Sequence, residues 1–249
     1  MSAWMKLEPT RHQVAIAGVV SDAQTGQVMH GAEVKIERGS TDFERWLNLK
    51  EMQYRDRFRA TGDRPDRKSV QLNPSLSLIL EGDTQLPHLL TYTALDGHFY
   101  FLDLPAGVYT LVVSLPAAGT RYGTVRVDDL EVTQDSNADT IKRGIADIAL
   151  PPTTIKGRVI DAQASTETRK IGVVMARVQV EGGQEVTFSD RTGQYLLTGL
   201  EVCQKPSNHP SASPKPIIKV SAQGYQSLSA GVWLSQGEVK DLDFSLTRT

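Results

Sequence analysis

Residues 96–113 have the sequence DGHFYFLDLPAGVYTLVV, which is typical of a β-hairpin. The Asp96-Gly97 pair predicts a tight turn, because glycine takes a positive φ freely and aspartate tolerates one. From residue 98 to 104 apolar and polar side chains alternate, with the period of a half-buried strand. The Pro-Ala-Gly break at 105–107 turns the chain, and a second alternating run follows it. We therefore expect two strands here that pair antiparallel.

The same pattern recurs later in the chain, so the sequence contains an internal duplication. Residues 190–200 repeat the turn and the first strand, and residues 217–225 repeat the second strand. Other matched segments are Ile16–Asp22 with Ile155–Asp161, 32–37 with 176–181, and Ile145–Leu150 with Asp241–Leu246. Duplicated units of short alternating strands separated by turns are typical of antiparallel β-sandwiches.

The sequence therefore predicts an all-β protein of two tandem antiparallel β-sandwiches, of which the first carries a helical insertion. A length of 249 residues favours two domains, since domains usually span roughly 100–200 residues. Pro151-Pro152 is expected to be a stiff linker, because proline cannot continue a β-ladder. The predicted parts are an N-terminal arm (1–11), a first sandwich (12–150) with an insertion (38–88), the linker (151–152) and a second sandwich (153–249).

Residues 42–59 within the insertion depart from the strand pattern and predict an amphipathic helix. Thr41 and Glu44 fit a capping box, in which each side chain bonds the backbone amide of the other residue. Apolar residues, many of them aromatic, recur at roughly helical spacing, and the other face is rich in arginine. The apolar face can pack on its own sandwich, which is the nearest sheet, or on a partner subunit.

The candidate interaction surface consists of aromatic side chains, because tryptophan and tyrosine are enriched at interface hot spots. Its members are Trp4, Phe43, Trp46, Tyr54, Phe58 and Trp233. Trp4 belongs to the arm and the next four belong to the predicted helix. Trp233, together with Tyr195 and Tyr225, is also a candidate for binding carbohydrate.

No catalytic, cofactor-binding or metal-binding residue is predicted from the sequence. The five histidines lack the close spacing to one another, to cysteine or to carboxylates that a zinc site needs. The single cysteine, Cys203, excludes an internal disulfide. With 27 basic and 29 acidic residues, the chain lacks the basic excess that nucleic acids attract. We expect a protein that is not an enzyme, uses no cofactor and binds no nucleic acid.

The sequence also predicts where the protein is found. Its first residues show no apolar stretch of signal-peptide length, and nowhere do about 18 apolar residues run together. We therefore expect no membrane span and a cytoplasmic location, either free or as part of a large particle.

Each copy of the duplicated unit resembles the carboxypeptidase regulatory-like domain, a transthyretin-like sandwich. The residues that carry the resemblance are 18–22, 25–26, 31–34, 96–101 and 104–109 in the first copy, and 157–161, 176–178, 192–195, 199–200 and 220–225 in the second. The resemblance implies a transthyretin-like or Ig-like fold. It says little about function, because this domain occurs in peptidases, surface proteins, transport receptors and phage-like assemblies.

From these features we expect a structural or assembly protein, a rigid two-domain spacer that docks to protein subunits of a larger complex. Proteins that have this domain without a leader resemble accessory components of phage-tail-like contractile injection particles, which implies a place at a baseplate. One alternative is a carbohydrate- or ligand-binding adhesion module. The other is a pair of accessory domains of an enzyme, although the chain is too short to hold a peptidase domain beside two sandwiches.

Overall fold

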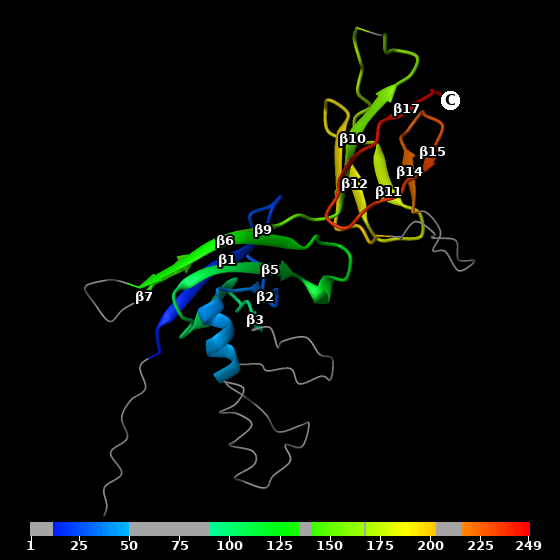
Figure 1. Cartoon of the computed structure of the whole chain (residues 1–249). Helices are drawn as coiled ribbons and strands as arrows, with labels where there is room; N and C mark the ends of the chain where they lie inside the picture. The colour runs from blue at the N-terminus through cyan, green and yellow to red at the C-terminus, as the bar shows by residue number, and fades with distance from the viewer. Residues whose placement is uncertain (1–11, 50–89, 135–140, 167, 203–215) are drawn as a thin grey trace, which may run out of the picture. The chain divides into compact units, whose positions relative to one another are not determined.

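The computed structural model describes residues 12–49, 90–134, 141–166, 168–202 and 216–249. Over these residues the chain is built mostly from β-strands (Figure 1), which confirms the predicted all-β class. The described helical segments are residues 41–49 and a short 3-10 turn, η1 (Pro116–Ala118). The predicted arm (1–11) and most of the predicted insertion lie outside the described residues.

The contacts within the chain divide it into two compact units. The first comprises Met1–Ser21, Val28–Val113 and Arg126–Ile148, and the second comprises Asp22–Gln27, Ser114–Val125 and Ala149–Thr249. Two loops from the first half of the chain therefore belong to the second unit by their contacts. The sequence pattern does not indicate this, because it reports the faces of strands and not the packing of loops.

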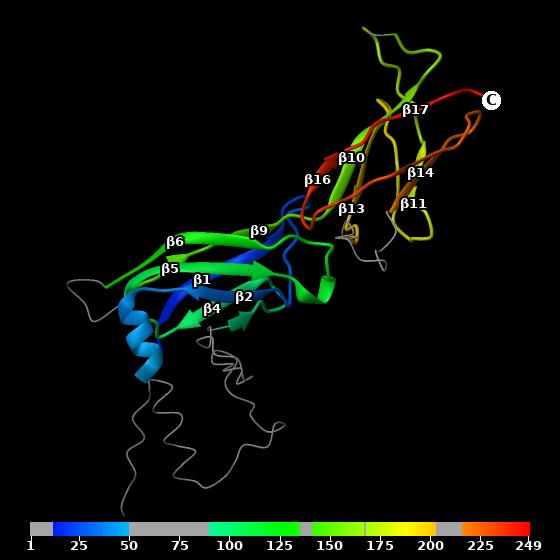
Figure 2. The same ribbon diagram turned by 45° about the vertical axis from the view of Figure 1, so that its right-hand side comes forward.

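The first unit contains two sheets (Figure 2). One has the order β4-β1-β8, and β9 also pairs β1. Its strands are β1 (Val14–Asp22), β4 (His98–Leu102), β8 (Gly144–Ile145) and β9 (Ile148–Leu150). The other sheet has the order β3-β2-β5-β6-β7. Its strands are β2 (Glu33–Arg38), β3 (Leu90–Tyr92), β5 (Gly107–Ser114), β6 (Val125–Gln134) and β7 (Ile141–Lys142).

The second unit also contains two sheets. One has the order β13-β10-β16, and β17 also pairs β10. Its strands are β10 (Thr154–Asp161), β13 (Gln194–Thr198), β16 (Val239–Asp241) and β17 (Phe244–Leu246). The other sheet is the antiparallel array β12-β11-β14-β15. Its strands are β11 (Arg177–Val180), β12 (Val186–Phe188), β14 (Ile217–Ser221) and β15 (Leu228–Gly231).

The two strands of the 96–113 stretch form as predicted, but they do not pair with each other. β4 lies beside β1, whereas β5 lies between β2 and β6 in the other sheet. The predicted hairpin is therefore wrong, and the segment is an arch that crosses between sheets. Asp103, with φ of 56°, and the buried Leu104 lie in the crossing. An alternating pattern specifies which face of a strand is buried but not which strand lies beside it.

The alternating side chains build a core in each unit. In the first unit the buried residues include Ile16, Val34, Phe99, Phe101, Tyr109 and Leu111. In the second they include Ile155, Val178, Tyr195, Leu197, Val220 and Phe244. β13 illustrates the cause, since its exposed and buried residues alternate strictly along the strand.

Hydrogen bonds that recur in both units confirm the duplication. In each unit, the loop before the last strand donates one backbone amide to a carbonyl oxygen of the first strand. An aspartate side chain in the same loop accepts a backbone amide of the first strand. These bonds are Ala146 N–Ala17 O (2.9 Å) and Val19 N–Asp147 Oδ1 (3.2 Å), then Leu242 N–Lys156 O (2.8 Å) and Arg158 N–Asp243 Oδ1 (2.7 Å). The loop approaches so closely that a Cβ on Gly18 or Gly157 would lie 1.8 or 1.9 Å from a backbone oxygen.

A buried hydroxyl group is repeated as well. Thr93 Oγ1 donates to Met29 O (2.7 Å) and accepts from Ala32 N (2.9 Å). The corresponding bonds in the second unit are Ser189 Oγ to Val173 O (2.6 Å) and Ala176 N to Ser189 Oγ (2.8 Å). In each unit one side chain therefore satisfies two buried backbone groups that would otherwise lack a partner.

The helix at 41–49 begins one residue before the position that the sequence predicts. Ser40 O accepts from Glu44 N (3.1 Å), and Ser40 Oγ accepts from Phe43 N (3.3 Å). Ser40 is therefore the N-cap, and the predicted capping box at Thr41 is wrong by one residue. The remainder of the predicted helix, from residue 50, lies outside the described residues.

Candidate interaction surface

The aromatic residues at the start of the helix pack on their own unit. Phe43 is 5% exposed and meets the ring of Tyr109 edge-on, with the centroids 5.3 Å apart. Trp46 is half-buried and stacks on Phe43 at 5.9 Å. Leu47 completes the buried face of this segment. Three further members of the predicted surface, Trp4, Tyr54 and Phe58, lie outside the described residues.

The three aromatic residues considered for carbohydrate binding do not form one exposed platform. Tyr195 is 4% exposed, and its hydroxyl donates to Leu242 O (2.5 Å). Burial raises the pKa of Tyr195, so the hydroxyl stays protonated and acts as a donor. Its selection as a surface residue is therefore wrong, because it occupies an inward position of β13. Trp233 is half-buried, and its backbone oxygen accepts from Lys240 Nζ (2.7 Å).

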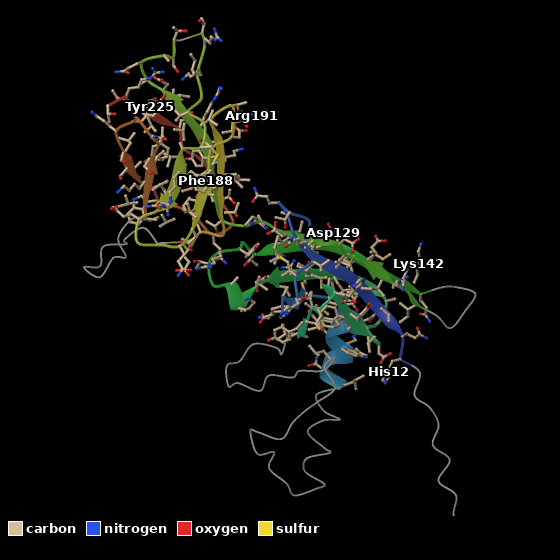
Figure 3. The ribbon with its side chains drawn as sticks, turned by 180° about the vertical axis from the view of Figure 1, so that it is seen from behind. His12, Asp129, Lys142, Phe188, Arg191 and Tyr225 are labelled. Atoms are coloured by element: carbon tan, nitrogen blue, oxygen red, sulfur yellow. The ribbon has the colours of Figure 1, made fainter. Side chains whose placement is uncertain are left out.

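Tyr225 (labelled in Figure 3), the third of these residues, donates a hydrogen bond to a buried carboxylate, that of Asp161. Asp161 is 1% exposed, and its Oδ2 accepts from the Tyr225 hydroxyl (2.9 Å) and from Arg248 Nε (2.8 Å). Its Oδ1 accepts the amides of Gln163 and Ala164, both at 2.9 Å. These hydrogen bonds lower the pKa of Asp161 to about 2, because each stabilises the charged carboxylate. The bond from the Ala164 amide has the largest effect.

Asp22 holds the equivalent turn of the other copy. It accepts the amides of Gln24 (2.7 Å) and Thr25 (2.8 Å) and the hydroxyl of Tyr122 (2.7 Å). Burial raises the pKa of Asp22, but the hydrogen bonds outweigh it and the net pKa is lowered. Burial and the Asp22 carboxylate raise the pKa of Tyr122 to about 12. Both aspartates are thus fully engaged in holding turns and tyrosines, which is a structural role.

A hollow of about 740 Å³ lies within the second unit. Its apolar lining includes Leu200 and Leu234. On its rim Arg121 pairs with Glu185 (3.3 Å) and Glu201 (3.2 Å), so this cation is already neutralised by two carboxylates. The sequence does not predict this hollow, because its lining comes from five separate stretches of chain.

Exposed apolar side chains gather at the edge strand β12. Val186 and Phe188 are 43% and 50% exposed, and Val174 and Met175 are also exposed. Met175 N donates to Ser189 O (3.0 Å), which places the second pair beside the end of β12. Phe188 is labelled in Figure 3. Alternation in the sequence predicts β12 as a strand, but its position at a sheet edge depends on the topology.

The described residues contain no group of three or more histidine, cysteine, aspartate or glutamate side chains that could hold a metal ion. None of the helices in the described part of the chain has the length and apolar character needed to cross a membrane.

Comparison with known proteins assigns no family to the chain. No family model matches the chain, and no curated protein matches it. Among solved structures, the Bacillus anthracis TIE protein is similar with a TM-score of 0.31 and 10% identity, covering 95% of this chain and 34% of that one. The chain thus spans about a third of that protein's length.

Two pilins are similar over nearly their whole length. GBS52, the minor pilin of Streptococcus agalactiae, has a TM-score of 0.29 and 11% identity, covering 96% of this chain and 97% of that one. The shaft pilin SpaA of Lactobacillus rhamnosus GG has a TM-score of 0.30 and 10% identity, covering 97% and 98%. At TM-scores this low, the likeness says nothing about the function of this chain.

Proposed function

We propose that this protein is a non-enzymatic assembly protein, whose two sandwich units dock to protein subunits of a larger complex. The observation that carries the proposal is the apolar edge of β12, where Val186 and Phe188 are exposed side by side with open backbone groups. Edge strands of folded proteins usually carry charges, prolines or bulges that prevent pairing. An uncharged, apolar edge is a site for association with another chain.

The use of the ionisable groups supports a structural role. Asp22 and Asp161, the buried carboxylates of the described residues, each accept two turn amides and a tyrosine hydroxyl. A catalytic acid or base needs at least one lone pair directed at a substrate. Here the carboxylate oxygens are directed at the protein itself.

Sedimentation of a native lysate of the source cells tests the proposal. The wild-type protein is expected in fractions far heavier than a dimer of its 27.3 kDa chain. Phe188→Lys is expected to move the protein to light fractions, whereas Leu228→Lys, on the β15 edge of the same sheet, is expected to leave it in place. A wild-type protein found only in light fractions would overturn the proposed function.

Two finer hypotheses extend this proposal. The first is that the larger complex is a contractile injection particle, a hypothesis that rests on the resemblance of each copy to the carboxypeptidase regulatory-like domain, which also occurs in phage-like assemblies. Mass spectrometry of purified particles tests it, and absence of the chain from them contradicts it. The second, a cytoplasmic location, stays a prediction that cell fractionation tests.

A further inference from the structure

The free edge of β12 can be located from its hydrogen bonds to β11. Val180 N donates to Glu185 O (3.1 Å), and Ser189 N donates to Ala176 O (2.9 Å). In an antiparallel pair the bonding residues alternate, so Thr187 also directs its backbone groups toward β11. The N–H and C=O groups of Val186 and Phe188 therefore point to the other side. Among the described residues, no strand pairs with β12 on that side.

We infer that β12 pairs antiparallel with β12 of a second copy of this chain, about a two-fold axis at Thr187. This inference rests on the proposed function and names the partner of the same edge. It would join two four-stranded sheets β12-β11-β14-β15 edge to edge (Figure 1). A two-fold contact closes on itself, so β12 joins two copies and no more, and the larger complex needs further contacts outside β12.

The register follows from the side chains. With the axis at Thr187, Val186 of each copy lies opposite Phe188 of the other. In both pairs, the backbone N–H and C=O groups that point away from β11 face the same groups of the second copy. An axis at Phe188 would set Val186 against Asp190, and an axis at Val186 would set Phe188 against Gln184. Only the Thr187 register places both exposed apolar side chains against apolar partners.

The charges beyond the strand ends favour the same register. It brings Arg191 (labelled in Figure 3) toward the Gly182-Gly183 turn of the second copy, which the exposed Glu181 precedes; Glu185, after this turn, already pairs with Arg121 of its own chain (3.3 Å). A basic group of each copy thus approaches an acidic turn of the other, twice in the dimer. Within β12 itself no charged residue or proline opposes the pairing.

The competing edges in this unit are β15 of the same sheet and β13 and β16 of the other sheet. Each has one exposed large apolar side chain, Leu228 (43%), Leu196 (41%) and Val239 (51%) respectively. β12 is the better edge, because two exposed apolar side chains lie on it and two more, Val174 and Met175, lie beside its end. A strand of three residues makes a small contact, so the dimer is expected to be weak and concentration-dependent.

Sedimentation velocity of the purified full chain, over about a hundredfold range of concentration, tests the dimer. A monomer–dimer equilibrium is expected. Phe188→Lys should weaken it by at least about tenfold in the dissociation constant, because the change occurs twice in each dimer. Leu228→Lys and Leu196→Lys should leave it unchanged, and thermal unfolding confirms that each variant is folded.

A cysteine at the axis tests the register independently of the lysine variants. In a Cys203→Ser background, Thr187→Cys should form an intermolecular disulfide under mild oxidation. Opposed residues that are not hydrogen-bonded lie about 4.5 Å apart at Cα, within disulfide range. Leu196→Cys is the matched control and should stay monomeric.

Two results would overturn the inference. One is a wild-type chain that stays monomeric at every concentration. The other is cross-linking of Leu196→Cys without cross-linking of Thr187→Cys. Either result leaves the proposed function standing if the wild-type chain still sediments with a large complex in lysate, so the two failures are distinguishable.

Discussion

The buried hydroxyl of Thr93 gives the sharpest test of how these units are held together. Thr93→Val keeps the shape of the side chain but removes its oxygen, which bonds Met29 O (2.7 Å) and Ala32 N (2.9 Å). The variant keeps the neighbouring backbone hydrogen bond, from Thr93 N to Ala32 O (2.9 Å), because this bond does not involve the side chain. Two buried backbone groups would therefore lose this partner in a site that is 5% exposed.

The magnitude follows from these contacts. Each buried group left without a partner costs roughly 1–3 kcal/mol, and the added methyl group of valine offsets about 1 kcal/mol through apolar burial. We therefore expect Thr93→Val to lower the free energy of unfolding of the first unit by about 1–5 kcal/mol. Thr93→Ser keeps the hydroxyl and loses only a methyl group, so its effect is expected to be about 1 kcal/mol.

Urea unfolding followed by circular dichroism measures these differences, and amide hydrogen exchange at Ala32 reports them locally. Thr93→Val should lower the midpoint of the first unit without changing the slope, and it should speed exchange at Ala32. If Thr93→Val is as stable as Thr93→Ser and Ala32 stays protected, the hydroxyl bridge does not stabilise the unit and the reasoning is refuted.

The remaining predictions concern four other positions. Gly157→Ala should lower the unfolding midpoint of the second unit sharply, because the new Cβ would lie 1.9 Å from Leu242 O; an unchanged midpoint contradicts the close approach. The pKa of Asp161 is about 2 when folded, below its ordinary value of 3.8, so its contribution to stability is complete above pH 4 or so and is lost as the pH falls toward 2. Urea midpoints of Asp161→Asn and wild type should therefore converge over that interval, and a constant difference would refute the assignment. Phe43→Ala should destabilise the first unit by about 3–5 kcal/mol in urea unfolding, because the ring is buried against its own unit; a neutral variant would show that the ring packs elsewhere. Carbohydrate binding stays a prediction, and a glycan array on which wild type binds and Trp233→Ala does not would support it.

Much of the fold could be predicted from local pattern. Phe99 and Phe101 are buried on one face of β4, and Tyr109 and Leu111 are buried in β5, as their alternation predicts. The duplication was also visible, because the two copies share turn residues at matching places. The helix start was missed by one residue, because serine and threonine at 40 and 41 are both good caps and only the backbone geometry distinguishes them.

The candidate surface was predicted less well than the fold. The sequence selects aromatic residues by type, yet Tyr195 and Phe43 are buried, whereas Trp46, Tyr225 and Trp233 are half-buried. Phe188 was not selected, although it is 50% exposed on an edge strand. The type of a residue indicates how much its burial would stabilise the fold. Whether the residue is in fact buried depends on which segments pack against its strand.

The sequence by itself therefore determined the secondary-structure class, the repeat and the buried face of most strands, because each depends on residues close together in the chain. Only the tertiary structure decided that β4 and β5 lie in different sheets, that loops 22–27 and 114–125 belong to the second unit, and that β12 is an edge. These are questions of which segments lie beside one another. A strand has the same alternating pattern whichever neighbour it pairs with, so the pairing depends on the packing of the whole unit.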